Sequence, residues 1–199
     1  MGCLKNIFRA VILTLAVIGF LTLGGKELVT GLINNYFNPS KDVLLERAQK
    51  VGDFRHINDE FEIERAAGIM GYNAVVAEHK ASGQKMFVVD SKDKPILTAE
   101  DIKSDNVEEK LKKALSKVKY QSISVDELHV TKHGTMNSYG KTVPYVKFEA
   151  RIKKLPIGDV GGIVSVAETK DSESRLLISL NEKSKYSQLI SDEFFRKIK

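Results

Sequence analysis

The sequence has one cysteine, no tryptophan and only four prolines. The cysteine is Cys3, so the rest of the chain cannot be held together by disulfide bonds and must fold around a hydrophobic core. Residues 41–199 are long enough for one ordinary domain. Small extracellular eukaryotic modules usually carry disulfides, so their absence favours a bacterial envelope protein over a eukaryotic secreted one.

Neither basic nor acidic residues are in large excess. The chain has 31 Lys and Arg against 26 Asp and Glu, and residues 41–199 keep 28 against 25, because the first forty residues hold three basic residues and one acidic residue. A nucleic-acid-binding domain normally concentrates basic residues on one face, with aromatic side chains between them. We therefore expect no nucleic-acid partner, and at most a weak attraction to anionic lipid head groups.

One long apolar run interrupts this ordinary composition, at residues 7–23 (IFRAVILTLAVIGFLTL). As a helix it would be about 25 Å long, slightly short of a hydrocarbon core of about 30 Å. Lys5 and Arg9 lie at its start, whereas the two charges that follow it cancel. We predict a single transmembrane anchor with the N-terminus in the cytoplasm. Its apolar residues are Ile7, Ala10, Val11, Ile12, Leu13, Leu15, Val17, Ile18, Phe20, Leu21 and Leu23.

A cleaved secretory signal is the alternative interpretation of this run. The uninterrupted core, residues 10–23, falls within the length of about 7–15 residues that such signals have. Thr22, Leu23 and Gly24 make a poor cleavage site, which favours the uncleaved anchor. Lipid attachment at Gly2 or Cys3 is disfavoured, because Asn6 stands where the myristoylation motif needs Ser or Thr.

The chain is therefore expected to have three parts. Residues 1–25 form the cytoplasmic N-terminus and the anchor, residues 26–40 form a stalk or linker, and residues 41–199 form an extracytoplasmic domain. An amphipathic helix is expected within the stalk, because five apolar residues keep a helical spacing before Pro39: Leu28, Val29, Leu32, Ile33 and Tyr36.

Three helices are expected in the domain. The first covers residues 41–51, with Ser40 as its N-cap and Gly52 in the left-handed position after its end. The second starts at a capping box formed by Asp105 and Glu108. The third begins at about residue 184 and is expected to bury Tyr186, Leu189, Ile190, Phe194 and Ile198.

The remaining segments are expected to form hairpins. Residues 72–79 and 84–90 flank a turn that contains Gly83, and further strands are expected at 123–130, 146–152, 163–167 and 175–180. A change of phase at Asp126 and Glu127 predicts a β-bulge. Residues 53–70 fit either a strand or a helix.

This order predicts an α+β domain with a mostly antiparallel sheet of about six strands, packed by two to three helices. In outline it is similar to cystatin-like folds, in which a curved sheet cups a helix.

Several local patterns resemble catalytic or binding motifs but fail a physical test. Residues 134–142 place five residues between two glycines where a phosphate-binding loop needs four, and a strand rather than a helix follows. His129 and His133 are four residues apart, which in a strand is about 13 Å and too far for one metal ion. Ser91 and Lys94 lie in a charged loop rather than at a desolvated helix start. We therefore predict no catalytic, cofactor or metal site from these motifs.

Tyr139 is the aromatic residue that we most expect to be exposed, at the tip of a hairpin, where it would be a possible partner contact. Taken together, the sequence favours a single-pass envelope protein whose exported domain is a non-enzymatic binding module for an envelope partner. The alternative is a secreted or periplasmic small-ligand carrier or hydrolase, with a pocket built from residues distant in the sequence. Whether the protein is an enzyme is left open.

Overall fold

The computed structural model describes residues 41–69, 72–90, 95–116, 124–153, 159–169 and 173–199. The apolar run 7–23 and the stalk 26–40 lie outside this part, and so do Ser91 and Lys94. Within the described ranges, no helix is both long enough and apolar enough to cross a membrane.

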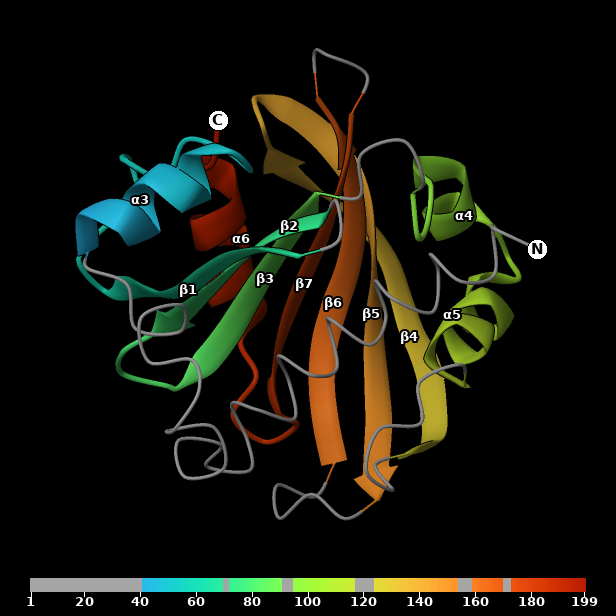
Figure 1. The fold of residues 1–199 in the computed structure, drawn as a ribbon. Helices are drawn as coiled ribbons and strands as arrows, with labels where there is room; N and C mark the ends of the chain where they lie inside the picture. Colours follow the sequence, from blue (N-terminus) through green and yellow to red (C-terminus); the bar gives the residue numbers. More distant parts are fainter. Residues whose placement is uncertain (1–40, 70–71, 91–94, 117–123, 154–158, 170–172) are drawn as a thin grey trace.

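The domain is built on one antiparallel sheet, so the expected α+β class is confirmed (Figure 1). The sheet has seven strands rather than about six, in the order β1-β2-β3-β7-β6-β5-β4. The strands are β1 (Phe61–Ile69), β2 (Tyr72–His79), β3 (Gln84–Asp90), β4 (Ser124–Ser138), β5 (Lys141–Lys153), β6 (Asp159–Glu168) and β7 (Ser174–Glu182).

Strands that follow each other along the chain are neighbours, with one exception. β1, β2 and β3 form one meander, and β4 to β7 form another. The two meanders join where β3 pairs with β7, with Phe87 opposite Ile178. Residues 53–70, which fit either element in the sequence, contain strand β1, whose pairing with β2 shifts register between Ile63 and Arg65.

In the described part of the chain, four short helices lie on the two faces of the sheet. α4 (Ala99–Lys103) and α5 (Val107–Ser116) lie on the face that we call the α5 face, whose apolar core includes Ile102 and Leu111. α3 (Lys41–Gln49) and α6 (Gln188–Lys197) lie on the opposite face, the α6 face, whose core includes Leu44 and Phe194. This two-sided packing differs from the expected curved sheet around one helix.

The first helix is present but spans Lys41–Gln49 rather than 41–51, and its predicted N-cap, Ser40, lies outside the described residues. Gly52 after it does not adopt a left-handed conformation, since the positive-φ glycines of the described chain are Gly83 and Gly140. Gly52 is required for space instead. A Cβ atom there would lie 2.8 Å from Cγ2 of Ile198 and 2.9 Å from the Tyr139 hydroxyl. The glycine thus lets the C-terminal segment approach the end of α3.

The predicted capping box at Asp105 and Glu108 is wrong. α5 begins at Val107, and the Glu108 carboxylate accepts hydrogen bonds from Lys112 and from the backbone N–H of Val130 on β4. A capping box does start α4, where the Thr98 hydroxyl and the Asp101 carboxylate each accept a backbone N–H from the other residue. The Glu108 carboxylate, which the sequence predicts to cap this helix, is therefore used in a tertiary contact with β4.

The last helix begins at Gln188 rather than at about residue 184. Phe194 and Ile198 are fully buried, as predicted, but the Leu189 side chain is 79% exposed. The expected burial of Leu189 is therefore wrong, because the first turn of α6 presents it to solvent.

Strands β4 and β5 form a long hairpin with its tip at Tyr139 and Gly140, so residues 134–142 do form a hairpin end. The predicted bulge is confirmed as a register shift between Val125 and Glu127, and a second shift follows between Val130 and Lys132. β4 lies at one end of the sheet and β1 at the other.

Candidate functional site

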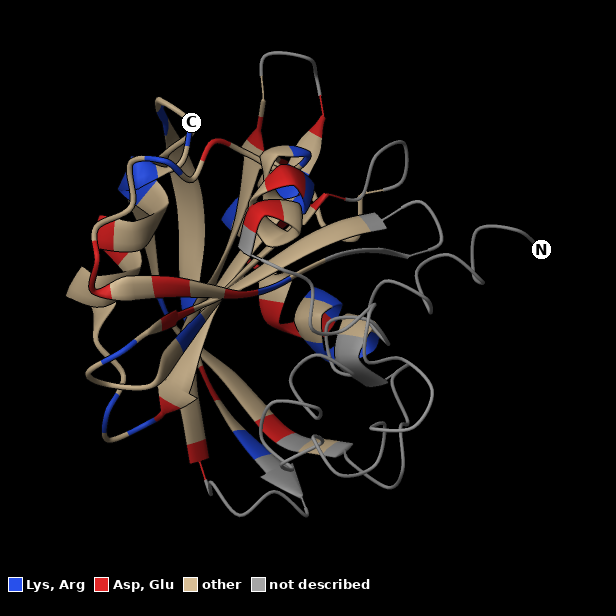
Figure 2. Ribbon diagram, turned by 60° about the vertical axis from the view of Figure 1, so that its left-hand side comes forward, with Lys and Arg blue, Asp and Glu red and all other residues tan. Residues whose placement is uncertain are grey.

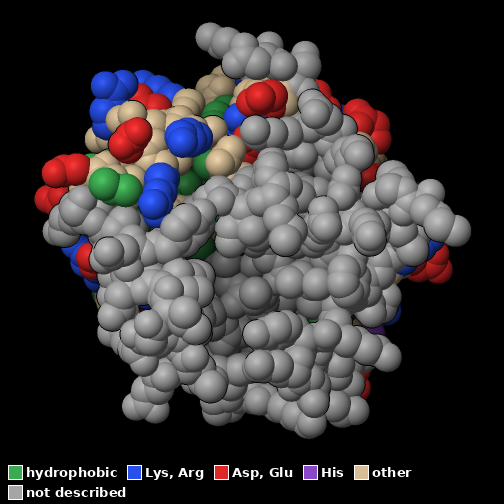
Figure 3. Space-filling model, viewed as in Figure 1, with side chains coloured by type: hydrophobic (Ala, Val, Ile, Leu, Met, Phe, Trp, Pro, Cys, Tyr) green, Lys and Arg blue, Asp and Glu red, His purple; other side chains and the backbone are tan. Residues whose placement is uncertain are grey.

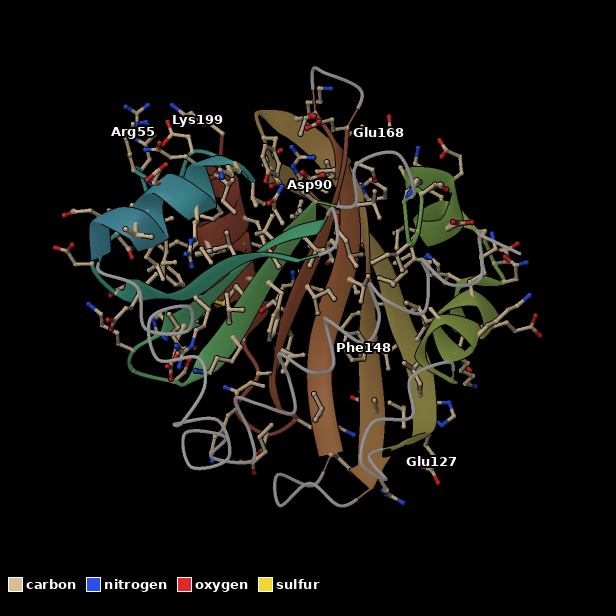
Figure 4. All side chains as sticks on the ribbon, viewed as in Figure 1. Arg55, Asp90, Glu127, Phe148, Glu168 and Lys199 are labelled. Atoms are coloured by element: carbon tan, nitrogen blue, oxygen red, sulfur yellow. The ribbon has the colours of Figure 1, made fainter. Side chains whose placement is uncertain are left out.

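A buried ion pair lies where the two meanders meet, on the α6 face. Nη1 of Arg175 on β7 donates to Oδ1 of Asp90 on β3 over 2.8 Å, and the two residues are 5% and 2% exposed. Arg175 also donates from Nε to the Val51 carbonyl over 3.1 Å and from Nη2 to Glu173. Figure 4 shows Asp90 inside the domain, at the end of β3.

The Arg175 guanidinium therefore already donates to three acceptors of this chain. Burying two charges is costly unless each is paired and hydrogen-bonded, and here Asp90 also accepts a bond of 3.4 Å from the Asn73 amide. We interpret this cluster as structural, because its contacts tie β3, β7 and the end of α3 together.

Tyr139 belongs to the same end of the molecule. Its hydroxyl donates to the Val51 carbonyl over 2.8 Å, and its ring packs against the core of the α6 face. Burial raises the pKa of the Tyr139 phenol well above its ordinary value. The predicted exposure of Tyr139 is therefore wrong, because the tip of the hairpin folds its side chain onto α3 and the C-terminus. A partner contact through its remaining exposed part stays a prediction.

A second buried network holds α6 on the sheet. The Gln84 amide nitrogen on β3 lies 2.9 Å from the hydroxyls of Ser179 and Ser191 and from the Ser187 carbonyl. The Gln84 carbonyl accepts from the Ser187 N–H, which lies at the start of α6. The network is fully buried, since the exposed fraction is 0% for Gln84, Ser179 and Ser191. We therefore interpret it as structural as well.

A third cluster is partly exposed and lies on β1, β2 and β3. Nζ of Lys85 donates to Glu64 over 2.8 Å and to Glu78 over 2.7 Å, and the three side chains are 20%, 25% and 30% exposed, respectively. Two carboxylates from different strands therefore converge on one ammonium group. No local pattern of residues indicates this cluster, because the three residues come together only through strand pairing.

The two carboxylates of this cluster differ in proton affinity. Burial, followed by its hydrogen bond with Glu78, raises the pKa of Glu64 above its ordinary value. Burial also acts to raise the pKa of Glu78, but its hydrogen bonds with Glu64 and Lys85 outweigh that effect and lower it. Carboxylates with opposed shifts are the usual components of general acid–base chemistry, although ordinary ion-pair networks show such shifts as well.

The histidines give no metal centre. His129 and His133 are both exposed on β4, and their strand partners are Glu149 and Val146. Nδ1 of His129 lies 3.9 Å from the Glu108 carboxylate. Across the described residues, no group of three or more potential ligands is arranged to hold a metal ion.

The charged surface is mixed rather than polarised. Basic and acidic residues are interspersed along the described elements of the ribbon in Figure 2, and both signs occur with hydrophobic atoms over α3 in Figure 3. The exposed large hydrophobic residues in the described chain are Val43, Leu45 and Leu189.

Comparison with known proteins does not assign the chain to a family. No protein-family model matches the sequence, and no curated protein gives a significant match.

Proposed function

We propose that this chain is a single-pass protein of the bacterial cytoplasmic membrane whose domain, residues 41–199, is a non-enzymatic binding module outside that membrane. The observation that carries the proposal is the apolar run 7–23 with Lys5 and Arg9 at its start and a cysteine-free domain behind it. The domain would engage another envelope protein.

The β4 edge is the surface that we propose for this contact. β4 is a terminal strand of 15 residues, about 50 Å long by the usual rise per residue. An edge strand offers backbone groups to an added strand of a partner. On β4 the Val130 N–H is already bonded to the Glu108 carboxylate, so we propose that the contact lies beyond it, around His133. The exposed side chains along it are polar: Glu127, His129, Thr131, Lys132, His133, Thr135 and Asn137.

The location is tested by expressing the full chain with a C-terminal tag in a bacterial host. Mass, membrane fractionation and protease access in spheroplasts are measured on the same cells. We expect an uncleaved, membrane-bound protein that is digested only from outside. A protein shortened by about 24 residues and free in the exported soluble fraction would contradict the anchor and support a cleaved signal.

The contact surface is tested by placing a photo-crosslinking residue at His133 in cells. The matched control position is Lys80, which is exposed in the turn between β2 and β3. We expect a discrete crosslinked envelope protein from position 133 and none from position 80. Equal crosslinking from both positions would contradict a contact at the β4 edge.

The carrier or hydrolase alternative is favoured by the cluster of Glu64, Glu78 and Lys85. The two carboxylates would supply a general acid and a general base for hydrolysis, and the Lys85 ammonium would hold both in place. Substitution of Glu64→Gln would then abolish turnover of a substrate while leaving the fold intact, whereas a binding module would keep its partner. Crosslinking of the Glu64→Gln variant at position 133 distinguishes the two.

A further inference from the structure

The open length of the β4 edge is limited by other parts of this chain. At one end, the Val130 N–H donates to the Glu108 carboxylate. At the other end, the Tyr139 N–H donates to the Ile198 carbonyl over 3.1 Å, so the C-terminal segment is bonded to the hairpin tip. The stretch between these two contacts, residues 131–138, is therefore the part of the edge that an added strand could use (Figure 1).

The backbone groups of this stretch point away from β5 at every second residue. Ser138 pairs with Lys141 across the turn at the hairpin tip, which directs the N–H and C=O of Ser138 towards β5. Backbone direction alternates along a strand, so the same groups of His133, Thr135 and Asn137 point outwards. Within the described chain, no residue bonds to these outward groups. They extend over about 14 Å, which suits an added strand of about five to six residues.

The charges on the α6 side of this hairpin are matched at one pair of opposed residues and unmatched at another. Glu127 lies opposite Arg151, and Nη1 of Arg151 is 3.7 Å from the Glu127 carboxylate. Lys132 lies opposite Lys147, and like charges at directly opposed positions repel each other. The Lys147 ammonium is 5.5 Å from the centroid of the Tyr186 ring, whereas the exposed Lys132 has no ion-pair partner among the described residues. The edge therefore presents an uncompensated positive charge.

The next position on the same side of the edge has no side chain. Gly134 lies two residues after Lys132, and a Cβ atom there would be 2.5 Å from Cζ of its strand partner Tyr145. The Tyr145 ring thus takes the place of a side chain beside the edge, and at 8% exposure it offers an apolar contact but not a pocket. On the opposite side, His133 and Thr135 are exposed and polar. The two sides of the edge therefore favour different residues in an added strand.

We propose that the partner adds an extended segment of about six residues to β4 at residues 132–137, with an acidic side chain beside Lys132. This inference rests on the proposed contact between the β4 edge and an envelope protein, and it specifies the chemistry of that contact. The acidic side chain compensates the opposed charges of Lys132 and Lys147. Because side chains alternate along a strand, the next partner residue on that side lies beside Gly134 and is apolar, and the residue between them is polar.

A second copy of this chain is a poorer occupant of the edge. Residues 131–139 contain no Asp or Glu, so a second β4 edge could not supply the acidic side chain. It would instead add its own Lys132 and Lys147 to the interface, which disfavours pairing between copies. Self-association is therefore an outcome of the test and not the proposal.

The charge is tested in the full chain, in cells, with the photo-crosslinking residue at position 133. Lys132→Glu is compared with the matched control Lys80→Glu, which makes the same change at an exposed lysine in the turn between β2 and β3. We expect the crosslinked product to fall about tenfold or more for Lys132→Glu and less than twofold for the control, because a glutamate at position 132 repels an acidic partner. The new glutamate lies opposite Lys147, so the urea midpoint of the variant should not be lower than that of the parent.

The backbone pairing is tested with Thr135→Pro in the same assay. Proline is tolerated on an edge strand where the N–H points outwards, so the fold should remain while the donor for an added strand is lost. Thr135→Ala is the control, since it changes the side chain and keeps the N–H. We expect about a tenfold fall in crosslinking for Thr135→Pro and less than a twofold fall for Thr135→Ala.

The possible failures of these tests are distinguishable. Undiminished crosslinking in Lys132→Glu and Thr135→Pro would overturn this inference but leave the contact at the β4 edge in place. A fall for Lys132→Glu with no fall for a folded Thr135→Pro would assign the lysine to a surface contact without strand addition, which also overturns it. A product with the mass of two copies would assign the edge to self-association.

The absence of any product from position 133 in the parent chain would overturn the proposed contact and this inference together. Circular dichroism and urea unfolding establish that each variant is folded. If Thr135→Pro is unfolded, the charge reversal at Lys132 alone decides.

Discussion

The two faces of the sheet are built from different chemistry. Every buried polar or charged residue of the described chain belongs to the α6 side: Gln84, Asp90, Ser138, Ser165, Arg175, Ser179 and Ser191. That side also packs aromatic rings, with the Phe194 ring centroid 5.2 Å from that of Phe61 and 5.4 Å from that of Phe195. The buried side chains of the α5 face are apolar, mostly Val, Leu and Ile.

This difference has a physical meaning. Hydrogen bonds and ring contacts have preferred geometries, so the α6 face accepts α3, α6 and the hairpin tip in one arrangement. Aliphatic side chains tolerate several partners of similar size. The α6 face is therefore held in one arrangement by directional contacts, whereas the α5 face is held by aliphatic packing.

The largest expected effect is the loss of the buried cation. Arg175→Met removes the cation that neutralises the buried Asp90 carboxylate, and we expect the free energy of unfolding to fall by about 3–5 kcal/mol in urea titrations. Arg151→Met is the control, because the Arg151 side chain is 56% exposed beside Asp159, and it should cost at most about 0.5 kcal/mol. A loss below 1 kcal/mol for Arg175→Met would mean that the α6 face does not depend on this pair.

A large cavity should also distinguish the two faces. Phe194→Ala removes a fully buried ring that contacts three other phenylalanine rings, so we expect a loss of about 3–5 kcal/mol. Phe148→Ala on the α5 face, where the ring is 8% exposed, should cost less because aliphatic neighbours can collapse around it. Thermal and urea unfolding of both variants measure this difference, and a greater loss for Phe148→Ala would reverse the comparison.

The Tyr139 hydroxyl provides a smaller effect with a pH signature. Tyr139→Phe removes its bond to the Val51 carbonyl and should cost about 1 kcal/mol at pH 8. Since the folded state raises the pKa of this phenol, its contribution is complete below pH 10 and declines as the pH rises above that value. The decline in stability above pH 10 should be shallower in the variant, with Tyr186 responsible for part of what remains. Identical slopes would contradict burial of Tyr139.

The smallest effect is expected at the start of α4, on the α5 face. Asp101→Asn weakens the capping box and the ion pair with Lys110, and should cost about 1 kcal/mol at pH 7. Burial acts to raise the pKa of Asp101, but bonds from Lys110 and Thr98 outweigh it and lower the pKa. Its contribution is therefore present above pH 4 and is lost as the pH falls further. Unfolding curves of both proteins at pH 7 and pH 3 should converge at the lower pH.

Local patterns predicted the parts of this fold that depend on neighbours in the sequence. The hairpin of β2 and β3 was predicted with its bounds, because two apolar runs flank a short turn in which Gly83 adopts a positive φ. The pairing of β3 with β7 could not be predicted, since nothing in either strand specifies a partner about 85 residues away.

The same distinction applies to the candidate sites. Glu64, Glu78 and Lys85 converge because a register shift in β1 and two strand pairings align them, and none of these is visible in a local motif. Tyr139 was mistaken for a surface residue because hairpin tips are usually exposed. Its hydroxyl bonds to the carbonyl of Val51, which follows α3 and lies 88 residues earlier in the chain.

Because β3 pairs with a strand that is synthesised much later, the sheet cannot be completed early in synthesis. The first meander is complete at Asp90, but the strand that covers its open edge begins at Ser174, and the C-terminal Lys199 still has to exchange backbone hydrogen bonds of 2.7 and 3.3 Å with Asp53. At about 5–20 residues per second, β3 would wait roughly 4–17 s with one edge unpaired. An edge left open for that long is prone to aggregate. The complete sheet therefore forms only after residues 174–199 have been synthesised.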